Sequence, residues 1–416
     1  MSLNGKRLLL LGGSNSVEDI RRFADAHGIT LLATAHPRYG QTALKKIADE
    51  AYDVNAVDVP GLVALVKSAR IDGIFPGCNE DIMPYAIAAA EACGLPVYCT
   101  AAVWDNCANK AKFKAMCEEN GIPVARVYDP AAAEAIPYPV AVKPADSCGS
   151  KGFSICRRAE ELPALVEYAR QFSRTGTVLV EDFIPYDAAI IHYTIADGRA
   201  VFCGISDKKS MLLARDSGSV MALQRFPSAD TETYLRTLDE KVRAMFARNH
   251  MQDGPVWIEA FNDNGRFIFN EVGYRFGGSM TYYPVRYFYG IDQLELMLRF
   301  ALGEHPVPEE MTELIRREVP GGKSYAILPL HVRPGRIAAV TGEGRVRAMP
   351  AVYAYVPIHG PGDTIAADAS VSRVFCYLHL LFDDEQDLRR LTAQILQTLS
   401  VPDEEGHNLL FRLFEF

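Results

Sequence analysis

Residues 257–278 have the sequence WIEAFNDNGRFIFNEVGYRFGG and contain two apolar runs around a short polar stretch. The runs at 257–261 and 267–273 are typical of β-strands, and the polar residues Asn262–Arg266 predict a turn between them. Two strands joined by a short turn form a hairpin. This stretch therefore predicts a hairpin that brings distant positions of the two runs together.

Glu259 and Glu271 interrupt the two runs, one on each strand. With a five-residue turn between the strands, their carboxylates face each other across the hairpin. An unpaired buried carboxylate is costly, and a shared cation removes that cost; oxygen-only ligands suit Mg²⁺ or Mn²⁺. Arg275 follows Glu271 closely and is suited to hold a phosphate or carboxylate as a bidentate donor. The alternative is a solvated rim of the hairpin.

A loop of small residues follows an apolar strand in residues 140–153, VAVKPADSCGSKGF. The strand presents Lys143 and stops at Pro144. Small side chains let backbone N–H groups approach phosphate oxygens, and a lysine adds a point charge. The alternative is a flexible surface loop with incidental lysines. The phosphate-binding interpretation involves the loop residues Ser147, Gly149, Ser150, Lys151 and Gly152.

A third stretch, residues 178–187, has the sequence VLVEDFIPYD, an apolar strand that runs into two acids and an apolar pair. A purine needs backbone donors and acceptors for its edge and apolar surfaces for its faces. The end of this strand, with Phe183 and Ile184, is able to supply both. The alternative is an ordinary edge strand with Glu181 and Asp182 in water.

Residues 6–100 alternate short apolar runs with helical stretches, which predicts a parallel sheet covered by helices. Ligands bind at the carboxyl ends of the strands in such sheets, where Gly12–Asn15 and Gly77–Asp81 fall. Gly12–Asn15 lacks the full G-x-G-x-x-G spacing, so a plain tight turn is the favoured interpretation there. Further expected elements are a strand at 96–98, helices at 101–125, 229–249 and 385–399, short strands from 321 onward, and a last strand at 411–416.

Composition limits the function. The chain has 416 residues, with 43 basic and 52 acidic side chains and a net charge of -9, which argues against a general nucleic-acid binder. The chain has no apolar run long enough to predict a membrane span or a signal peptide. The nine cysteines are odd in number and scattered, which favours a reduced cytoplasm over disulfides or zinc.

Taken together, the motifs supply lysines, a small-residue loop, a hinge suited to bind adenine, two carboxylates and an arginine. With its motifs in this order, the chain resembles the ATP-grasp ligases. The resemblance implies an α/β fold: a Rossmann-like N-terminal domain at 1–100, a two-lobed ATP-grasp domain at 101–305 and a β-rich C-terminal domain at 306–416. It also implies residue roles. Lys110 and Lys143 match the phosphate-binding lysines, Ser147–Gly152 the mobile phosphate loop, Glu181–Ile184 the adenine hinge, Asp187 the ribose acid, Glu259 and Glu271 the Mg²⁺ ligands, and Arg275 with Lys151 the catalytic cations.

One position departs from the family's pattern. Many members have E-x-N-x-R with Asn as a third metal ligand, whereas residues 271–275 have Gly273 there. A small residue at this position is similar to the L-amino-acid ligase branch, with carbamoyl-phosphate synthase large chains as close relatives. The resemblance implies Mg-ATP, a carboxylate and an amine as small-molecule substrates, and an acyl phosphate intermediate. A homodimer is the default expectation for an enzyme of this kind. A bicarbonate-using carboxylase and a non-catalytic nucleotide-binding protein are the alternatives.

Overall fold

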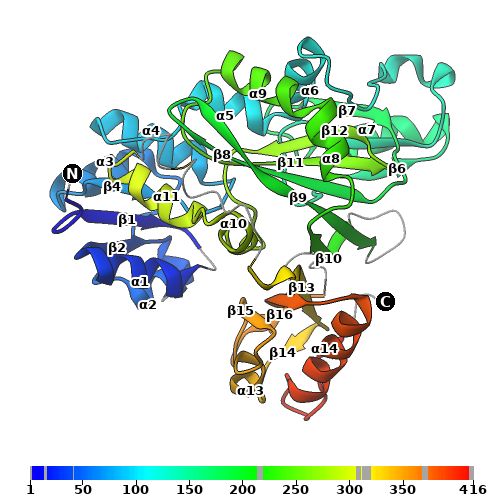
Figure 1. Cartoon of the computed structure of the whole chain (residues 1–416). Helices are drawn as coiled ribbons and strands as arrows, with labels where there is room; N and C mark the ends of the chain where they lie inside the picture. Colours follow the sequence, from blue (N-terminus) through cyan, green and yellow to red (C-terminus); the bar gives the residue numbers. More distant parts are fainter. Residues whose placement is uncertain are drawn as a thin grey trace.

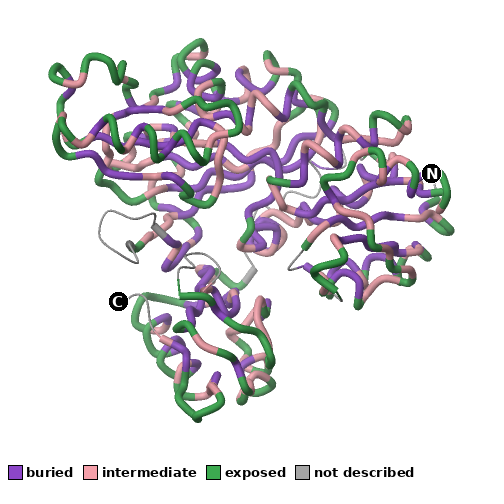
Figure 2. The backbone as a smooth tube through the Cα atoms, turned by 180° about the vertical axis from the view of Figure 1, so that it is seen from behind, coloured by how far each residue is buried: buried purple, intermediate pink, exposed green. Residues whose placement is uncertain are grey.

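The protein is described by a computed structural model that covers residues 2–13, 16–40, 42–212, 219–305, 311, 320–367 and 373–411. Figure 1 shows an N-terminal sheet with its helices beside a large central body, and a C-terminal part projecting from that body. Figure 2 shows that buried backbone follows the sheets, while exposed backbone lies on outer helices and loops. Among the described residues, no helix is both long enough and apolar enough to cross a membrane.

The N-terminal sheet is parallel, with strand order β3-β2-β1-β4, which confirms the predicted Rossmann-like arrangement. The prediction of a strand at 96–98 is wrong, because these residues pair with no strand. Tyr98 instead donates a hydrogen bond from its hydroxyl to the Tyr274 carbonyl oxygen at 2.7 Å, which ties this segment to the central body. Ser14 and Asn15 lie outside the described residues. The elements are β1 (Arg7–Leu11), α1 (Val17–His27), β2 (Thr30–Thr34), α2 (Ala43–Ile47), β3 (Glu50–Tyr52), α3 (Val59–Ser68), β4 (Gly73–Phe75) and α4 (Met83–Cys93).

A smaller, antiparallel sheet with order β6-β5-β7 forms one lobe of the central body. The predicted helix at 101–125 is interrupted: Asn109 is extended, and its side chain caps the second helix by accepting from the backbone N–H groups of Ala111 and Lys112. The cap fixes where Lys110 begins the helix. The elements are α5 (Ala101–Ala108), α6 (Lys110–Glu119), β5 (Val140–Pro144), β6 (Ser154–Cys156), α7 (Leu162–Arg170) and β7 (Val178–Asp182).

The largest sheet has nine strands, in the order β12-β11-β8-β9-β10-β13-β17-β15 with β18 beside β13. The helix predicted at 229–249 is two helices that meet at Leu238. The elements up to residue 301 are β8 (Ala188–Ala196), β9 (Arg199–Leu212), β10 (Ser219–Phe226), α8 (Thr231–Thr237), α9 (Asp239–Arg248), β11 (Gly254–Asp263), β12 (Arg266–Gly273), α10 (Tyr282–Tyr289) and α11 (Gln293–Ala301).

The C-terminal part continues this sheet, because β13 pairs with β10 in antiparallel register. The predicted domain boundary between residues 305 and 306 adjoins residues 306–310 and 312–319, which lie outside the described residues. The last strand begins at Leu410, and residues 412–416 also lie outside the described part. The elements are β13 (Ser324–Val332), β14 (Gly335–Arg336), α13 (Glu343–Arg347), β15 (Val352–Pro357), β16 (Thr364–Ile365), β17 (Val374–Phe382), α14 (Glu385–Thr398) and β18 (Leu410–Phe411).

Candidate active site

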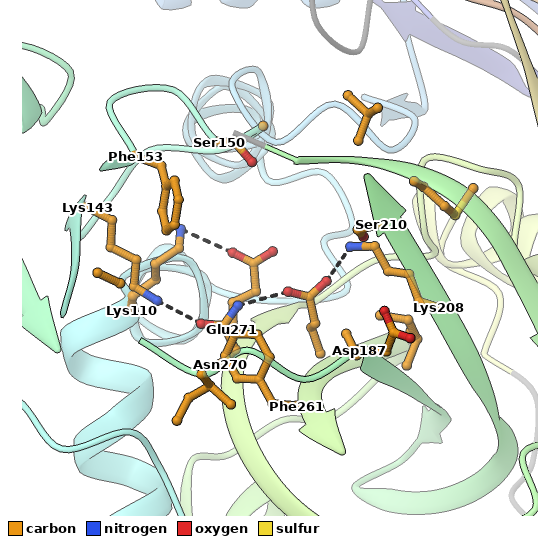
Figure 3. A pocket seen from close by; sticks show the side chains of 18 of the residues that line it. Lys110, Lys143, Ser150, Phe153, Asp187, Lys208, Ser210, Phe261, Asn270 and Glu271 are labelled. Atoms are coloured by element: carbon orange, nitrogen blue, oxygen red, sulfur yellow. Dashed lines mark hydrogen bonds and ion pairs between the residues drawn. The ribbon is translucent and has the colours of Figure 1, made fainter. Parts of the chain in front are cut away.

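A cavity of about 590 Å³ lies between the small sheet and the large one, within the size range of ligand sites. Figure 3 shows lysine and acidic side chains from several elements pointing toward one another in it. Most residues predicted from the three motifs line this cavity, although they are spread over 110–271. Among the predicted residues, those that line it are Lys110, Lys143, Ser147, Gly149, Ser150, Lys151, Glu181, Asp182, Phe183, Ile184, Asp187, Glu259 and Glu271.

The two glutamates of the hairpin are direct partners across β11 and β12, as predicted. The predicted five-residue turn is wrong, because Asp263 pairs with Arg266 and only two residues form the turn. A bulge restores the facing register: Glu259 opposes Glu271 and the next residue, Ala260, opposes Phe269, which leaves Asn270 as the extra residue. The bulge therefore brings Asn270 into the site as well.

Each glutamate is held by a lysine. Lys110 lies 3.2 Å from Glu271, and Lys208 of β9 lies 2.5 Å from Glu259. Burial alone would raise the pKa of Glu271, but Lys110, Lys143 and Lys208 together hold that pKa below its ordinary value. Both carboxylates thus lie beside lysine ammonium groups, so the cavity offers cationic and anionic groups side by side, as a polyanion bound together with a metal cation requires.

Glu181 sits at the centre of a second charged group. It is 2% exposed and pairs with Lys143 at 2.5 Å and with Lys114 at 2.8 Å. Burial lowers the pKa of Lys143, whereas both lysines hold the pKa of Glu181 below its ordinary value despite its burial. Lys143 also donates to the side-chain oxygen of Asn270 at 2.7 Å, and Asn270 donates to Glu259 at 2.8 Å. One chain of polar contacts therefore links the two acidic groups.

Sequence reasoning missed three members of this network: Lys114, Lys208 and Asn270. The sequence spacing could have identified Lys114, because it lies four residues after Lys110 and therefore on the same face of α6. Asn270 precedes Glu271, but only the bulge gives it a role. Lys208 lies on a long strand with no motif around it, and no local pattern marks it.

The small-residue loop curves over one side of the cavity. Gly149, Ser150 and Gly152 all have positive φ, so the chain turns sharply there. Lys110 donates from its ammonium to the carbonyl oxygen of Ser147 at 2.6 Å, which ties the loop to α6. Gly152 is not among the cavity-lining residues; a side chain there would meet Phe172 within 3.1 Å, so Gly152 serves close packing. Lys151 lies 3.6 Å from Asp81.

The strand end at β7 also lines the cavity. Asp182 is fixed by the hydroxyl of Tyr128, which donates to it at 2.5 Å, and by the backbone N–H of Arg126 at 3.3 Å. Phe183 and Ile184 follow it along the wall and offer apolar surface. The predicted hinge therefore lines the cavity, with its Asp182 carboxylate engaged by the protein rather than free for a ligand.

Arg275 lies at a smaller, second cavity of about 180 Å³, which the nearby Lys110 and Glu271 also line. Its guanidinium pairs with Glu80 at 2.7 Å, a residue just after β4. The ring of Trp257 lies beside it, 5.4 Å from the guanidinium carbon. A Cβ atom on Gly273 would lie 2.3 Å from that indole, so Trp257 occupies the space that a side chain at 273 would need. The departure from the E-x-N-x-R pattern thus has a steric cause.

Comparisons with known proteins agree with this architecture. Residues 105–305 match the family described as "Carbamoyl-phosphate synthase L chain, ATP binding domain". The formate-dependent phosphoribosylglycinamide formyltransferase of Erwinia tasmaniensis is 30% identical over 289 residues, which cover 65% of this chain and 70% of that protein.

Two crystal structures share the fold. The L-amino acid ligase of Bacillus licheniformis superimposes with a TM-score of 0.77 at 18% identity, covering 96% of this chain and 99% of that one. The biotin carboxylase domain of Hydrogenobacter thermophilus 2-oxoglutarate carboxylase, in complex with MgADP and bicarbonate, gives 0.76 at 19% identity, covering 95% and 90%. The chain belongs to the ATP-grasp family of ATP-dependent ligases.

Proposed function

We propose that the chain joins a carboxylic acid to an amine through an acyl phosphate formed from ATP in the larger cavity. The observation that carries this proposal is the pair of facing glutamates, Glu259 and Glu271, surrounded by Lys110, Lys143 and Lys208. That arrangement suits a nucleotide triphosphate with a divalent cation. The adenine would lie against Phe183 and Ile184, and the phosphates would lie beneath the loop at 147–152.

Glu259 and Glu271 would hold Mg²⁺ or Mn²⁺. Their donor set fits, because both offer only oxygen, and Mg²⁺ takes its remaining ligands from water and phosphate. Within the described ranges, no group of three or more His, Cys, Asp or Glu side chains forms a metal cage, so the two carboxylates are the protein's share. When bound, the cation neutralises charge on the phosphate oxygens.

The chemistry has two balanced steps. A carboxylate oxygen of the acid attacks the γ-phosphorus of ATP, the bond from that phosphorus to the bridging oxygen breaks, and ADP leaves with the electron pair. The amine nitrogen then attacks the acyl carbon, the bond from that carbon to the phosphate oxygen breaks, phosphate leaves with its electrons, and the amine proton passes to solvent. Lys110, Lys143 and Arg275, with Lys151 on the loop, stabilise the charge that develops. The loop excludes water from the intermediate.

The relatives' printed activity, formate-dependent formyl transfer to phosphoribosylglycinamide, fits the same chemistry, so formate belongs among the acids to test. ADP release is measured with Mg-ATP and hydroxylamine as a trapping amine, in the presence of formate, pooled amino acids or other small acids. We expect hydroxamate and ADP in equal amounts. ADP release with bicarbonate alone would instead assign a carboxylase, and tight ATP binding without turnover on any acid would assign a non-catalytic nucleotide binder.

The assembly is a further part of this proposal. A homodimer is the default for an enzyme of this kind. Sedimentation of the purified chain with and without ATP measures it, and a single monomeric species at assay concentration would contradict the dimer.

A further inference from the structure

Asn270 is the extra residue of the bulge in β12, and its side chain lines the larger cavity. The amide of this side chain lies between two charged groups. Lys143 donates from its ammonium to the amide oxygen of Asn270 at 2.7 Å. The amide nitrogen of Asn270 donates to Oε1 of Glu259 at 2.8 Å. A neutral side chain therefore connects a lysine of the small sheet to one of the two facing glutamates.

The chemistry of the two partners fixes the orientation of the amide. A lysine ammonium only donates hydrogen bonds, and an ionised carboxylate only accepts them. The amide oxygen therefore has to face Lys143, and the amide nitrogen has to face Glu259. Each hydrogen bond includes a charged group, which makes it stronger than a hydrogen bond between neutral groups. Asn270 is thus held firmly at both ends.

The contact with Lys143 is compatible with a bound nucleotide. An ammonium group has three donors, and Lys143 uses two of them, on Glu181 and on Asn270. The third donor remains for a phosphate oxygen. Asn270 therefore keeps its partner when the larger cavity is occupied.

The two oxygens of Glu259 are held by donors of different charge. Oε1 accepts from the neutral amide of Asn270, and Oε2 accepts from the ammonium of Lys208 at 2.5 Å. Only 11% of the Glu259 side chain is exposed, so little water competes for either oxygen. A divalent cation that approaches Glu259 repels the ammonium of Lys208 but not the neutral amide. The cation therefore gains Oε2, while Oε1 stays with Asn270.

We propose, on the basis of the nucleotide and cation site described under the proposed function, that Asn270 is a positioning residue that withholds one oxygen of Glu259 and thereby makes the site select Mg²⁺ over Ca²⁺. Mg²⁺ requires near-octahedral geometry and keeps several of its waters, so one carboxylate oxygen is enough for it. Ca²⁺ takes about six to eight oxygen ligands and often binds both oxygens of a carboxylate. Withholding one oxygen therefore weakens Ca²⁺ binding more than Mg²⁺ binding.

The test measures nucleotide binding with each cation, which does not depend on turnover. Calorimetry gives the Kd of a non-hydrolysable ATP analogue at saturating Mg²⁺ or Ca²⁺ for the wild type and two variants. Asn270→Leu removes both hydrogen bonds at similar size, whereas Asn270→Asp keeps an acceptor for Lys143 but presents a carboxylate to Glu259. We expect the wild type to bind the analogue at least about tenfold more tightly with Mg²⁺ than with Ca²⁺. Both variants should reduce this ratio to within about threefold.

The matched control is Asn264→Gly, in the turn of the same hairpin. Asn264 is exposed and has a positive φ, which glycine adopts without strain. This variant should keep the wild-type ratio of the two Kd values. Thermal melting reports the folding of every variant, and Asn270→Asp provides the ratio if the loss of both hydrogen bonds unfolds Asn270→Leu.

Three results would overturn the inference and leave the nucleotide site standing. The first is a wild type that binds the analogue equally well with Mg²⁺ and Ca²⁺. The second is a wild-type ratio that persists in the folded Asn270 variants. The third is a loss of affinity that is equal for both cations, which would give Asn270 a packing role alone. Failure of the wild type to bind the analogue with either cation would instead overturn the proposed function, and this inference with it.

Discussion

The larger cavity and the smaller cavity share Lys110 and Glu271 but are built differently. The larger cavity is lined by four lysines and five acidic side chains, and many of these charges belong to one network: Lys114 and Lys143 flank Glu181, and Asn270 links them onward. In the smaller cavity, a single ion pair lies beside a single aromatic ring. The first arrangement shares charge among many groups, whereas the second depends on few contacts.

This difference predicts how the two cavities respond to substitution. In the larger cavity, several lysines share the contacts with a bound polyanion, so the loss of one contact is partly compensated. The smaller cavity depends on single contacts, namely one ion pair and one ring. Substitutions should therefore weaken the larger cavity gradually and change the smaller cavity abruptly.

The largest effect is expected where the two cavities meet, at Glu271. Replacing it by Gln removes the charge that Lys110 balances and one of the two proposed cation ligands. We expect ADP release to fall by at least about a thousandfold, in line with the loss of a group that stabilises transition-state charge. Turnover and ATP affinity are measured side by side. Normal turnover in Glu271→Gln would show that the cation site is elsewhere.

The smaller cavity is tested by Gly273→Asn, which introduces the asparagine of the E-x-N-x-R pattern. Because a Cβ there would lie 2.3 Å from the Trp257 ring, the hairpin must shift. We expect a loss of about 1–3 kcal/mol in the free energy of unfolding, measured by urea denaturation. The double variant Gly273→Asn with Trp257→Ala should recover most of the loss, since the ring that causes the clash is gone. Additive losses in the double variant would contradict the steric explanation.

The larger cavity is tested by Lys114→Met. Without Lys114, the buried Glu181 has only Lys143 as its partner, and the charge of Lys143 is no longer available for the nucleotide. We expect the Kd for ATP to rise about tenfold while the melting temperature changes little.

A second variant separates charge from packing. In Lys114→Met with Glu181→Gln, the positive charge of Lys143 is again uncompensated, and the Kd should return to within about threefold of the wild type. A double variant that binds ATP no better than Lys114→Met would mean that Lys114 matters only for packing.

Much of this arrangement was predictable from the sequence, for a physical reason. Parallel strands, the Gly-rich loop and the strand end at Glu181 each leave a local pattern, because backbone geometry dictates residue types nearby. We predicted that Glu259 and Glu271 face each other, but from a wrong turn length. They are partners because the bulge at Asn270 shifts the register by one residue. Bulges, like the helix break at Asn109, depend on contacts with distant segments.

The smaller cavity could not be predicted as a unit. Glu80 follows β4, far along the chain from the hairpin stretch that carries Trp257 and Arg275, and only the fold shows that they meet. Gly273 was recognisable as a departure from a pattern, but the ring that explains it lies on the neighbouring strand. Such details are set by contacts between strands, which leave no local pattern in a single sequence.

The smallest effect is expected at Asp81, on the segment after β4. This carboxylate lies 3.6 Å from Lys151 and 3.5 Å from the Cys148 sulfur, so it contacts the phosphate loop from the N-terminal sheet. The ion pair is largely exposed, and such pairs contribute about 0–1 kcal/mol. Asp81→Asn should release Lys151 toward the phosphates and lower the Kd for ATP by about two- to threefold, less so at high salt. Lys151→Ala is the matched control and should weaken ATP binding. Weaker ATP binding by Asp81→Asn would show instead that Asp81 holds the loop in the conformation that binds the nucleotide, which would extend the nucleotide site to the segment after β4.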